Sequence, residues 1–125
     1  MNFGNTIQMS QRTLDYLWKK QEITMDNIAN ISTPGYKKKE IAFEDTFRKK
    51  LEDASRSGTA ADVRNAIHNS DYIVYERSDS ARVDGNGVNI DVEYTELSRT
   101  ALHYQYLLQS VNSDITRLRT AIKGQ

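Results

Sequence analysis

The last third of this 125-residue sequence carries apolar residues spaced alternately four and three positions apart, without a break. A helix shows this heptad spacing when one narrow stripe must be buried against another helix. Only 38% of the chain is hydrophobic, so an unbroken series of this length does not arise from random placement. We therefore expect the protein to work through helix–helix contact rather than through a pocket. The positions of this C-terminal seam are Leu97, Ala101, Tyr104, Leu108, Val111, Ile115, Leu118 and Ile122.

A second, weaker seven-residue pattern predicts a helix over residues 5–30. Gln21 and Thr24 interrupt the apolar series. Polar residues at such positions lower stability but can fix the register of a coiled coil. A slightly imperfect amphipathic helix explains the pattern equally well. The apolar positions of this N-terminal seam are Ile7, Leu14, Leu17, Ile28 and Ile31.

Four further apolar residues lie beside or opposite the two seams. If the terminal helices cover each other within one chain, these side chains remain exposed, and exposed apolar groups on an elongated protein mark interfaces. We expect contacts with neighbouring subunits at Trp18, Met25, Tyr106 and Leu107.

The only proline of the chain predicts the end of the first helix. Pro34 disfavours helical geometry at Thr33 and lacks a backbone N–H group. The sequence Thr33-Pro34-Gly35-Tyr36 suits a type II turn, with proline at its second position and glycine at its third. Gly35 is accordingly expected to have a positive φ.

The middle of the chain is irregular. Apolar residues on one face predict a short helix over residues 40–54. The stretch Ser55–Ser70 is polar, and Ser57-Gly58-Thr59 within it is expected to form a loop. Tyr72–Tyr75 has strand composition, and turn-rich Asp84–Gly87 suggests a small β-hairpin nearby. The basic runs Lys37–Lys39 and Arg48–Lys50 are either solvated or contact an acidic partner.

The last helix is predicted to start at Asn89 or Asp91, either of which can cap it, and to end at Gly124. The sequence thus predicts a mainly α fold whose long N- and C-terminal helices pair as a coiled coil. Its parts are an N-terminal helix at residues 1–33, a small irregular middle segment with room for a short helix and hairpin at 34–88, and a C-terminal helix at 89–125.

Composition excludes several classes of function. Lys plus Arg and Asp plus Glu both number 17, so the basic excess of a nucleic-acid binder is missing. The chain has no cysteine and no secretory h-region, so composition alone would predict a cytoplasmic protein. The histidines, His68 and His103, belong to no catalytic motif. Asp84–Glu93 fails as a calcium loop because Arg82 occupies a ligand position. We expect no enzyme activity, metal, cofactor or small-molecule substrate.

The end of the first helix resembles the signature of flagellar rod, hook and hook-associated axial proteins. It reads N-I-A-N-I-S-T-P-G-Y-K, with matching positions Asn27, Ile28, Ala29, Asn30, Thr33, Pro34, Gly35 and Tyr36. The short chain leaves no room for a large central domain, which points to the small proximal-rod proteins. The segment D-G-N-G-V-N-I-D-V-E at residues 84–93 is similar to a motif of the most proximal of these. Asn89 stands where that motif has aspartate.

The resemblance implies a structural protein of the bacterial flagellar basal body, located in the rod in the periplasmic space. It implies export by the flagellar type III system without a cleaved signal peptide, and polymerisation with itself and other rod proteins. Further implied partners are the MS ring adaptor and the export gate. The export element of early subunits, phenylalanine followed by an apolar residue four positions on, fits at Phe3, Phe43 and Phe47 alike. The alternatives are another small rod protein and an unrelated coiled-coil adaptor.

Overall fold

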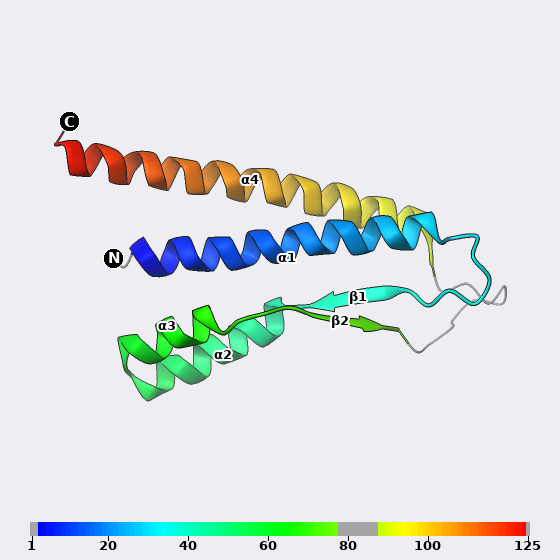
Figure 1. The fold of residues 1–125 in the computed structure, drawn as a ribbon, viewed down its shortest axis with the longest axis horizontal. Helices are drawn as coiled ribbons and strands as arrows, with labels where there is room; N and C mark the ends of the chain where they lie inside the picture. Colours follow the sequence, from blue (N-terminus) through cyan, green and yellow to red (C-terminus); the bar gives the residue numbers. More distant parts are fainter. Residues whose placement is uncertain (1–2, 78–87, 125) are drawn as a thin grey trace.

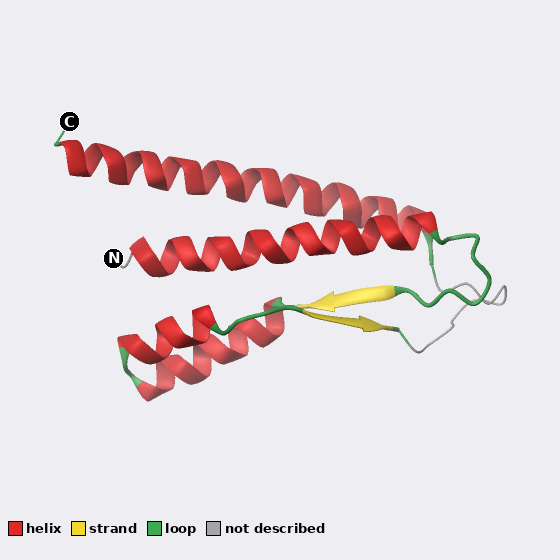
Figure 2. Cartoon of the chain, in the orientation of Figure 1, coloured by secondary structure: helices red, strands yellow, loops and turns green. Residues whose placement is uncertain are grey.

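The computed structural model describes residues 3–77 and 88–124 of the chain. Two long helices, α1 (Phe3–Ala29) and α4 (Ile90–Lys123), lie side by side. The middle segment folds as β1 (Lys39–Ala42), α2 (Glu44–Ser57), α3 (Ala60–His68) and β2 (Ile73–Glu76). Helix α1 contacts α4 on one side and β1 and α3 on the other, so it forms the central layer (Figure 1). The mainly α fold with paired terminal helices is confirmed (Figure 2).

Local signals set the ends of the terminal helices. The Asn89 side chain accepts hydrogen bonds from the Asp91 and Val92 N–H groups at 3.1 and 3.4 Å, which caps the start of α4 as predicted. Gly124 adopts a left-handed conformation at the other end. Helix α1 ends before Pro34, within two residues of the predicted boundaries.

The core lies where α1 meets the middle segment. Tyr16 and Leu17 of α1 are buried against Phe43, and the Tyr16 and Phe43 rings stack with centroids 4.9 Å apart. Phe43 in turn stacks on Phe47 at 5.1 Å. Because α1 is covered on two sides, its buried stripe is wider than a heptad seam.

The middle segment departs from the predicted elements in two places. The predicted helix over residues 40–54 is wrong at its start, because Lys39–Ala42 forms β1 and the helix begins only at Glu44. Tyr72–Tyr75 was correctly identified as a strand, but β2 pairs antiparallel with β1, with Ile41 opposite Val74. This pairing joins segments far apart in the chain, so local composition could not reveal it. The predicted hairpin turn Asp84–Gly87 lies outside the described residues.

The polar stretch Ser55–Ser70, for which no helix was predicted, contains all of α3. Gly58 ends α2 in a left-handed conformation, and Thr59 Oγ1 caps α3 by accepting from the Asp62 N–H group at 3.2 Å. The predicted loop is confirmed at Gly58 and Thr59, while Ser57 is the last residue of α2. Ile67, fully buried, anchors this short polar helix to the body of the protein.

Candidate assembly interface

The signature at the end of α1 is a capping and turn motif. The Asn30 side chain donates to the Asp26 carbonyl oxygen at 2.8 Å and accepts from Thr33 Oγ1 at 3.1 Å. The Tyr36 N–H group donates to the Thr33 carbonyl at 3.3 Å, and Gly35 has a φ of 71°. The positive φ predicted for Gly35 is confirmed, and it fits a type II turn. These residues act on the backbone and need no binding partner.

Asn27, another residue of the signature, holds three elements together. Its amide nitrogen donates to the Lys39 carbonyl at 2.9 Å and to Glu93 Oε2 at 3.3 Å. Its amide oxygen accepts from the Lys39 N–H group at 3.0 Å and from the Tyr36 hydroxyl at 3.1 Å. Asn27 is 1% exposed, so this side chain joins α1 to β1 and α4 inside the protein.

Glu93 brings a negative charge into the same place. This α4 side chain is 2% exposed, and Lys38 Nζ lies 2.7 Å from its Oε1 atom. A buried carboxylate requires a charged partner and hydrogen bonds, which Lys38 and Asn27 supply together. We call Asn27, Lys38 and Glu93 the polar clamp. The heptad pattern did not identify Glu93 as a contact residue, although Glu93 is the last residue of the motif at residues 84–93.

A second ion pair crosses between the helices. Lys20 Nζ of α1 lies 3.3 Å from Glu96 Oε2 of α4, with both side chains about one-third exposed. Burial raises the pKa of Tyr16, which lies beside Lys20. Burial lowers the pKa of Lys20 itself, but Tyr16 and Glu96 outweigh that effect and raise the pKa overall. Lys20 therefore stays charged beside α4.

The buried side of α4 differs from the predicted seam at three of its eight positions. Leu97, Tyr104, Val111 and Leu118 are half-buried, and so is Ala101. Three positions predicted for the seam are exposed in the chain, namely Leu108 at 41%, Ile115 at 40% and Ile122 at 77%. In their place, the buried and half-buried series runs through Glu93, Thr100, Leu107 and Asp114.

The predicted series and the covered series on α4 both follow heptad spacing. They have four positions in common, namely Leu97, Tyr104, Val111 and Leu118. The structure covers the more polar series and leaves the more apolar one at the surface. We call Leu108, Ile115 and Ile122 the apolar stripe of α4. Exposed apolar rows of this kind mark protein–protein contacts.

The N-terminal seam is covered within the chain. Leu17 is buried, while Ile7, Leu14, Ile28 and Ile31 are half-buried. Ile23 and Thr24, which are not among the apolar seam positions, are buried as well. Ala29 of the signature is exposed.

Three of the four predicted intersubunit residues are exposed. Trp18 is 61% exposed, Met25 51% and Tyr106 75%. Leu107 is half-buried and packs against the Tyr16–Leu17–Phe43 core, so most of its surface serves the chain's own fold. The Trp18 ring lies 5.9 Å from that of Tyr104, at the edge where α1 meets α4.

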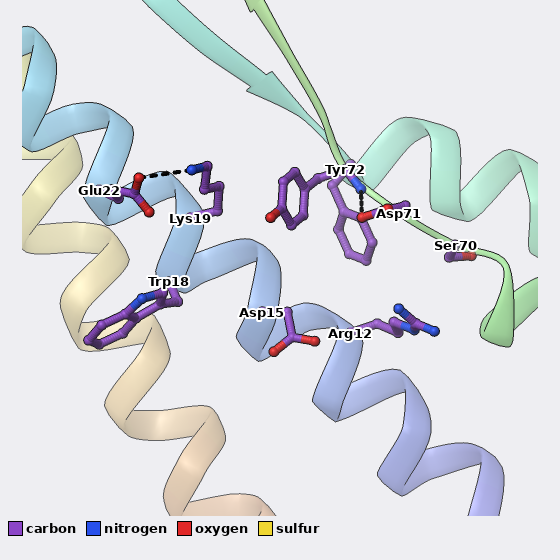
Figure 3. A pocket seen from close by; sticks show the side chains of 9 residues that line it. Arg12, Asp15, Trp18, Lys19, Glu22, Ser70, Asp71 and Tyr72 are labelled. Atoms are coloured by element: carbon purple, nitrogen blue, oxygen red, sulfur yellow. Dashed lines mark hydrogen bonds and ion pairs between the residues drawn. The ribbon is translucent and has the colours of Figure 1, made fainter.

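A shallow crevice of about 330 Å³ lies between α1 and the segment that follows α3 (Figure 3). In this view Tyr72 points toward α1, while Trp18 points away toward α4. Lys19 pairs with Glu22 at 2.8 Å, and the Arg12 guanidinium donates to the His68 carbonyl at 2.6 Å. These contacts hold α3 on α1, and the crevice offers no nucleophile–base pair. Its lining is Arg12, Asp15, Trp18, Lys19, Glu22, Phe43, Ser70, Asp71 and Tyr72.

Residues 3–77 and 88–124 form neither a metal-binding cluster nor a membrane-spanning helix. Across this described part, no group of three His, Asp or Glu side chains gathers as a metal ion would require. None of the helices described there has both the length and the apolar character needed to span a bilayer. His68 and His103 are exposed.

Comparison with known proteins gives matches over the whole chain. Residues 7–37 match a family model described as flagella basal body rod protein. The flagellar basal body rod protein FlgB of Bacillus subtilis is 31% identical over 126 residues, covering 98% of this chain and 96% of the relative. The FlgB protein of Aeromonas hydrophila is 30% identical, covering 100% and 98%, and that of Salmonella typhimurium is 27% identical, covering 94% and 93%.

Proposed function

The chain belongs to the FlgB family of flagellar basal body rod proteins, and from this premise we propose how it assembles. It is a structural subunit of the bacterial flagellar rod. It polymerises through its terminal helices with copies of itself and with other rod proteins. The role is structural rather than catalytic.

The observation that carries this proposal is the apolar stripe of α4. Leu108, Ile115 and Ile122 recur at seven-residue intervals and are all at least 40% exposed. A stripe of this form fits a partner helix, since two helices bury such rows by interdigitating their side chains. The partner helix then comes from a neighbouring subunit, because the chain's own α1 packs on the other series.

Trp18, Met25 and Tyr106 extend the proposed contact surface beyond the stripe. Charged residues dominate the outer helix α2, which lies on the far side of α1 from α4. This distribution favours an orientation in which α4 faces other subunits and the middle segment points outward. Burying the apolar side chains while leaving the charged ones in water is the lower-energy arrangement.

The finer placement follows from the family. We propose the proximal end of the rod in the periplasmic space, where the subunit joins the MS ring adaptor and export gate to the more distal rod. We also propose export by the flagellar type III system without a cleaved signal peptide. The family signature at residues 27–37 supports both steps.

The alternatives considered from sequence have less support. An unrelated coiled-coil adaptor would not match rod proteins over 98% of its length. The reported relatives are FlgB proteins, so Asn89 in place of aspartate does not favour another small rod protein. Asn89 instead caps α4 through its side-chain oxygen, a task that aspartate performs equally well.

Complementation of a deletion strain tests the proposal. Leu108→Asp and Ile115→Asp each place a charge on the stripe, and we expect both to abolish hook–basal bodies and motility. Ser113→Asp is the matched control, because it adds the same charge at an exposed position of α4 outside the stripe. Normal rods in both stripe variants would refute the role of α4. Exported protein levels, measured in parallel, separate failed assembly from failed export.

A further inference from the structure

Helix α4 could pack on α1 with either of two faces. Adjacent residues of a helix lie about 100° apart, so exchanging Glu93, Thr100, Leu107 and Asp114 for Ala101, Leu108, Ile115 and Ile122 requires a roll of only roughly 50° about the helix axis. The four positions common to both series would stay in contact throughout. The sequence therefore allows both packings by its spacing alone.

Burial of apolar surface would favour the packing that the structure does not show. The exposed series contains a leucine and two isoleucines beside the half-buried Ala101, whereas the covered series contains two carboxylates, a threonine and one leucine, Leu107. Leu108 is 41% exposed while Thr100 is only 2% exposed, so the less apolar side chain is the one that is covered. Some interaction must therefore select the polar face of α4.

The polar clamp has the geometry to make this selection. Glu93 lies in the first turn of α4, with Oε2 at 3.3 Å from the Asn27 amide and Oε1 at 2.7 Å from Lys38. Rolling α4 would pull this carboxylate away from both partners. Asn27 would lose one of its two acceptors, and Lys38 would keep only the 3.8 Å contact with Glu40. Buried polar contacts of this kind fix the register of paired helices even where they add little stability.

We propose that the polar clamp selects the face of α4 that packs on α1, and so keeps the apolar stripe exposed for another subunit. Asn27, Lys38 and Glu93 are then positioning residues for assembly without touching the partner. The benefit to assembly rests on the proposed function, whereas the selection of the face is a property of the single chain and is tested on it.

The chain has no cysteine, so single thiols can report which face is covered. Thr100→Cys and Leu108→Cys are introduced separately into the purified full-length protein, and the rate of maleimide labelling is measured for each. With the clamp intact, we expect Cys at position 108 to react at least about tenfold faster than Cys at position 100. Replacing the buried pair by Lys38→Met with Glu93→Leu should invert this order, because the roll then covers position 108.

The matched control is Lys20→Met with Glu96→Leu, which removes the more exposed ion pair between the same two helices. We expect the order of labelling to be unchanged in this control. Glu93→Gln provides a second clamp variant that keeps side-chain size, and it should narrow the difference between the two positions. Circular dichroism verifies the helical content of each variant.

Three results would overturn the inference. The first is an unchanged labelling order in the Lys38→Met, Glu93→Leu variant. The second is inversion in the Lys20→Met, Glu96→Leu control as well. The third is fast labelling at both positions, either in the parent or in both clamp variants, since this means that the helix is loosened rather than rolled. The Leu108→Asp experiment in cells tests the rod proposal separately from the labelling experiment. If the rod proposal failed, the labelling order expected of the single chain would not change.

Discussion

Replacing Asn27 with alanine tests whether the family signature stabilises the fold from inside the protein. The change removes two donated and two accepted hydrogen bonds, which reach Lys39, Glu93 and Tyr36. Each hydrogen bond contributes about 1 kcal/mol net, and unpaired groups left at a 1% exposed site add to the loss. The 3.3 Å contact with Glu93 is long, and Lys38 still pairs with that carboxylate. We expect the free energy of unfolding to fall by about 3 kcal/mol.

Asn30→Ala is the matched control for this prediction. Asn30 makes two side-chain hydrogen bonds at the half-buried end of the same helix, where water can replace them. Its loss should cost about 0.5–1 kcal/mol. The difference between the two variants is more reliable than either value, because the change of side chain is identical.

Urea unfolding provides the measurement, followed by circular dichroism and by fluorescence of Trp18, the only tryptophan. The Trp18 ring lies 5.9 Å from Tyr104, so its emission reports on the contact between α1 and α4. If Asn27→Ala costs no more than Asn30→Ala, the polar clamp does not hold the two helices and this reasoning is refuted.

Three further predictions concern the turn, the core and the response to pH. Gly35→Val should lower the unfolding free energy by about 1–2 kcal/mol because φ is 71°, which a β-branched side chain disfavours, whereas Gly35→Asn should be better tolerated because asparagine adopts the left-handed conformation more readily. Leu17→Ala, at a 2% exposed position, should cost about 2–5 kcal/mol in the same urea assay. Burial raises the pKa of Tyr16, so its contribution is fully present below about pH 10 and is lost as pH rises through the folded-state pKa. Tyr16→Phe should therefore reduce the fall of stability in alkaline buffer, and an unchanged slope would exclude Tyr16 as its source.

The terminal helices and the turn could be predicted because their signals are local. Pro34 ends α1, Asn89 caps α4 and Gly35 supplies a positive φ, each acting within a few residues of its own position. The strand pair could not be predicted in this way. Its pairing of Ile41 with Val74 depends on α2 and α3 folding between the strands, and Ile41 alone fits an amphipathic helix equally well.

The face of α4 that packs on α1 was predicted only in part, for a different reason. A heptad pattern counts apolar residues, and by that criterion Leu108 and Ile115 belong to the intramolecular contact. The structure instead covers Glu93 and Thr100. Glu93 pairs with Lys38, which lies in the loop before β1 and so leaves no trace in the heptad pattern of α4. Seven-residue spacing alone therefore identifies the candidate faces, and in our proposal the polar clamp decides between them.

The lengths of the two helices show that the pair is incomplete in a single chain. Helix α4 has 34 residues and α1 has 27, which correspond to about 51 and 40 Å. The last turns of α4 extend past the start of α1 (Figure 1), and Ile122 in this part is 77% exposed. Among residues 3–77 and 88–124 no other helix lies beside this extension, so its apolar surface is buried only when another molecule covers it. Since the apolar stripe runs into this same extension, one neighbouring helix could cover both, which is the arrangement expected of a subunit that completes its packing in the rod.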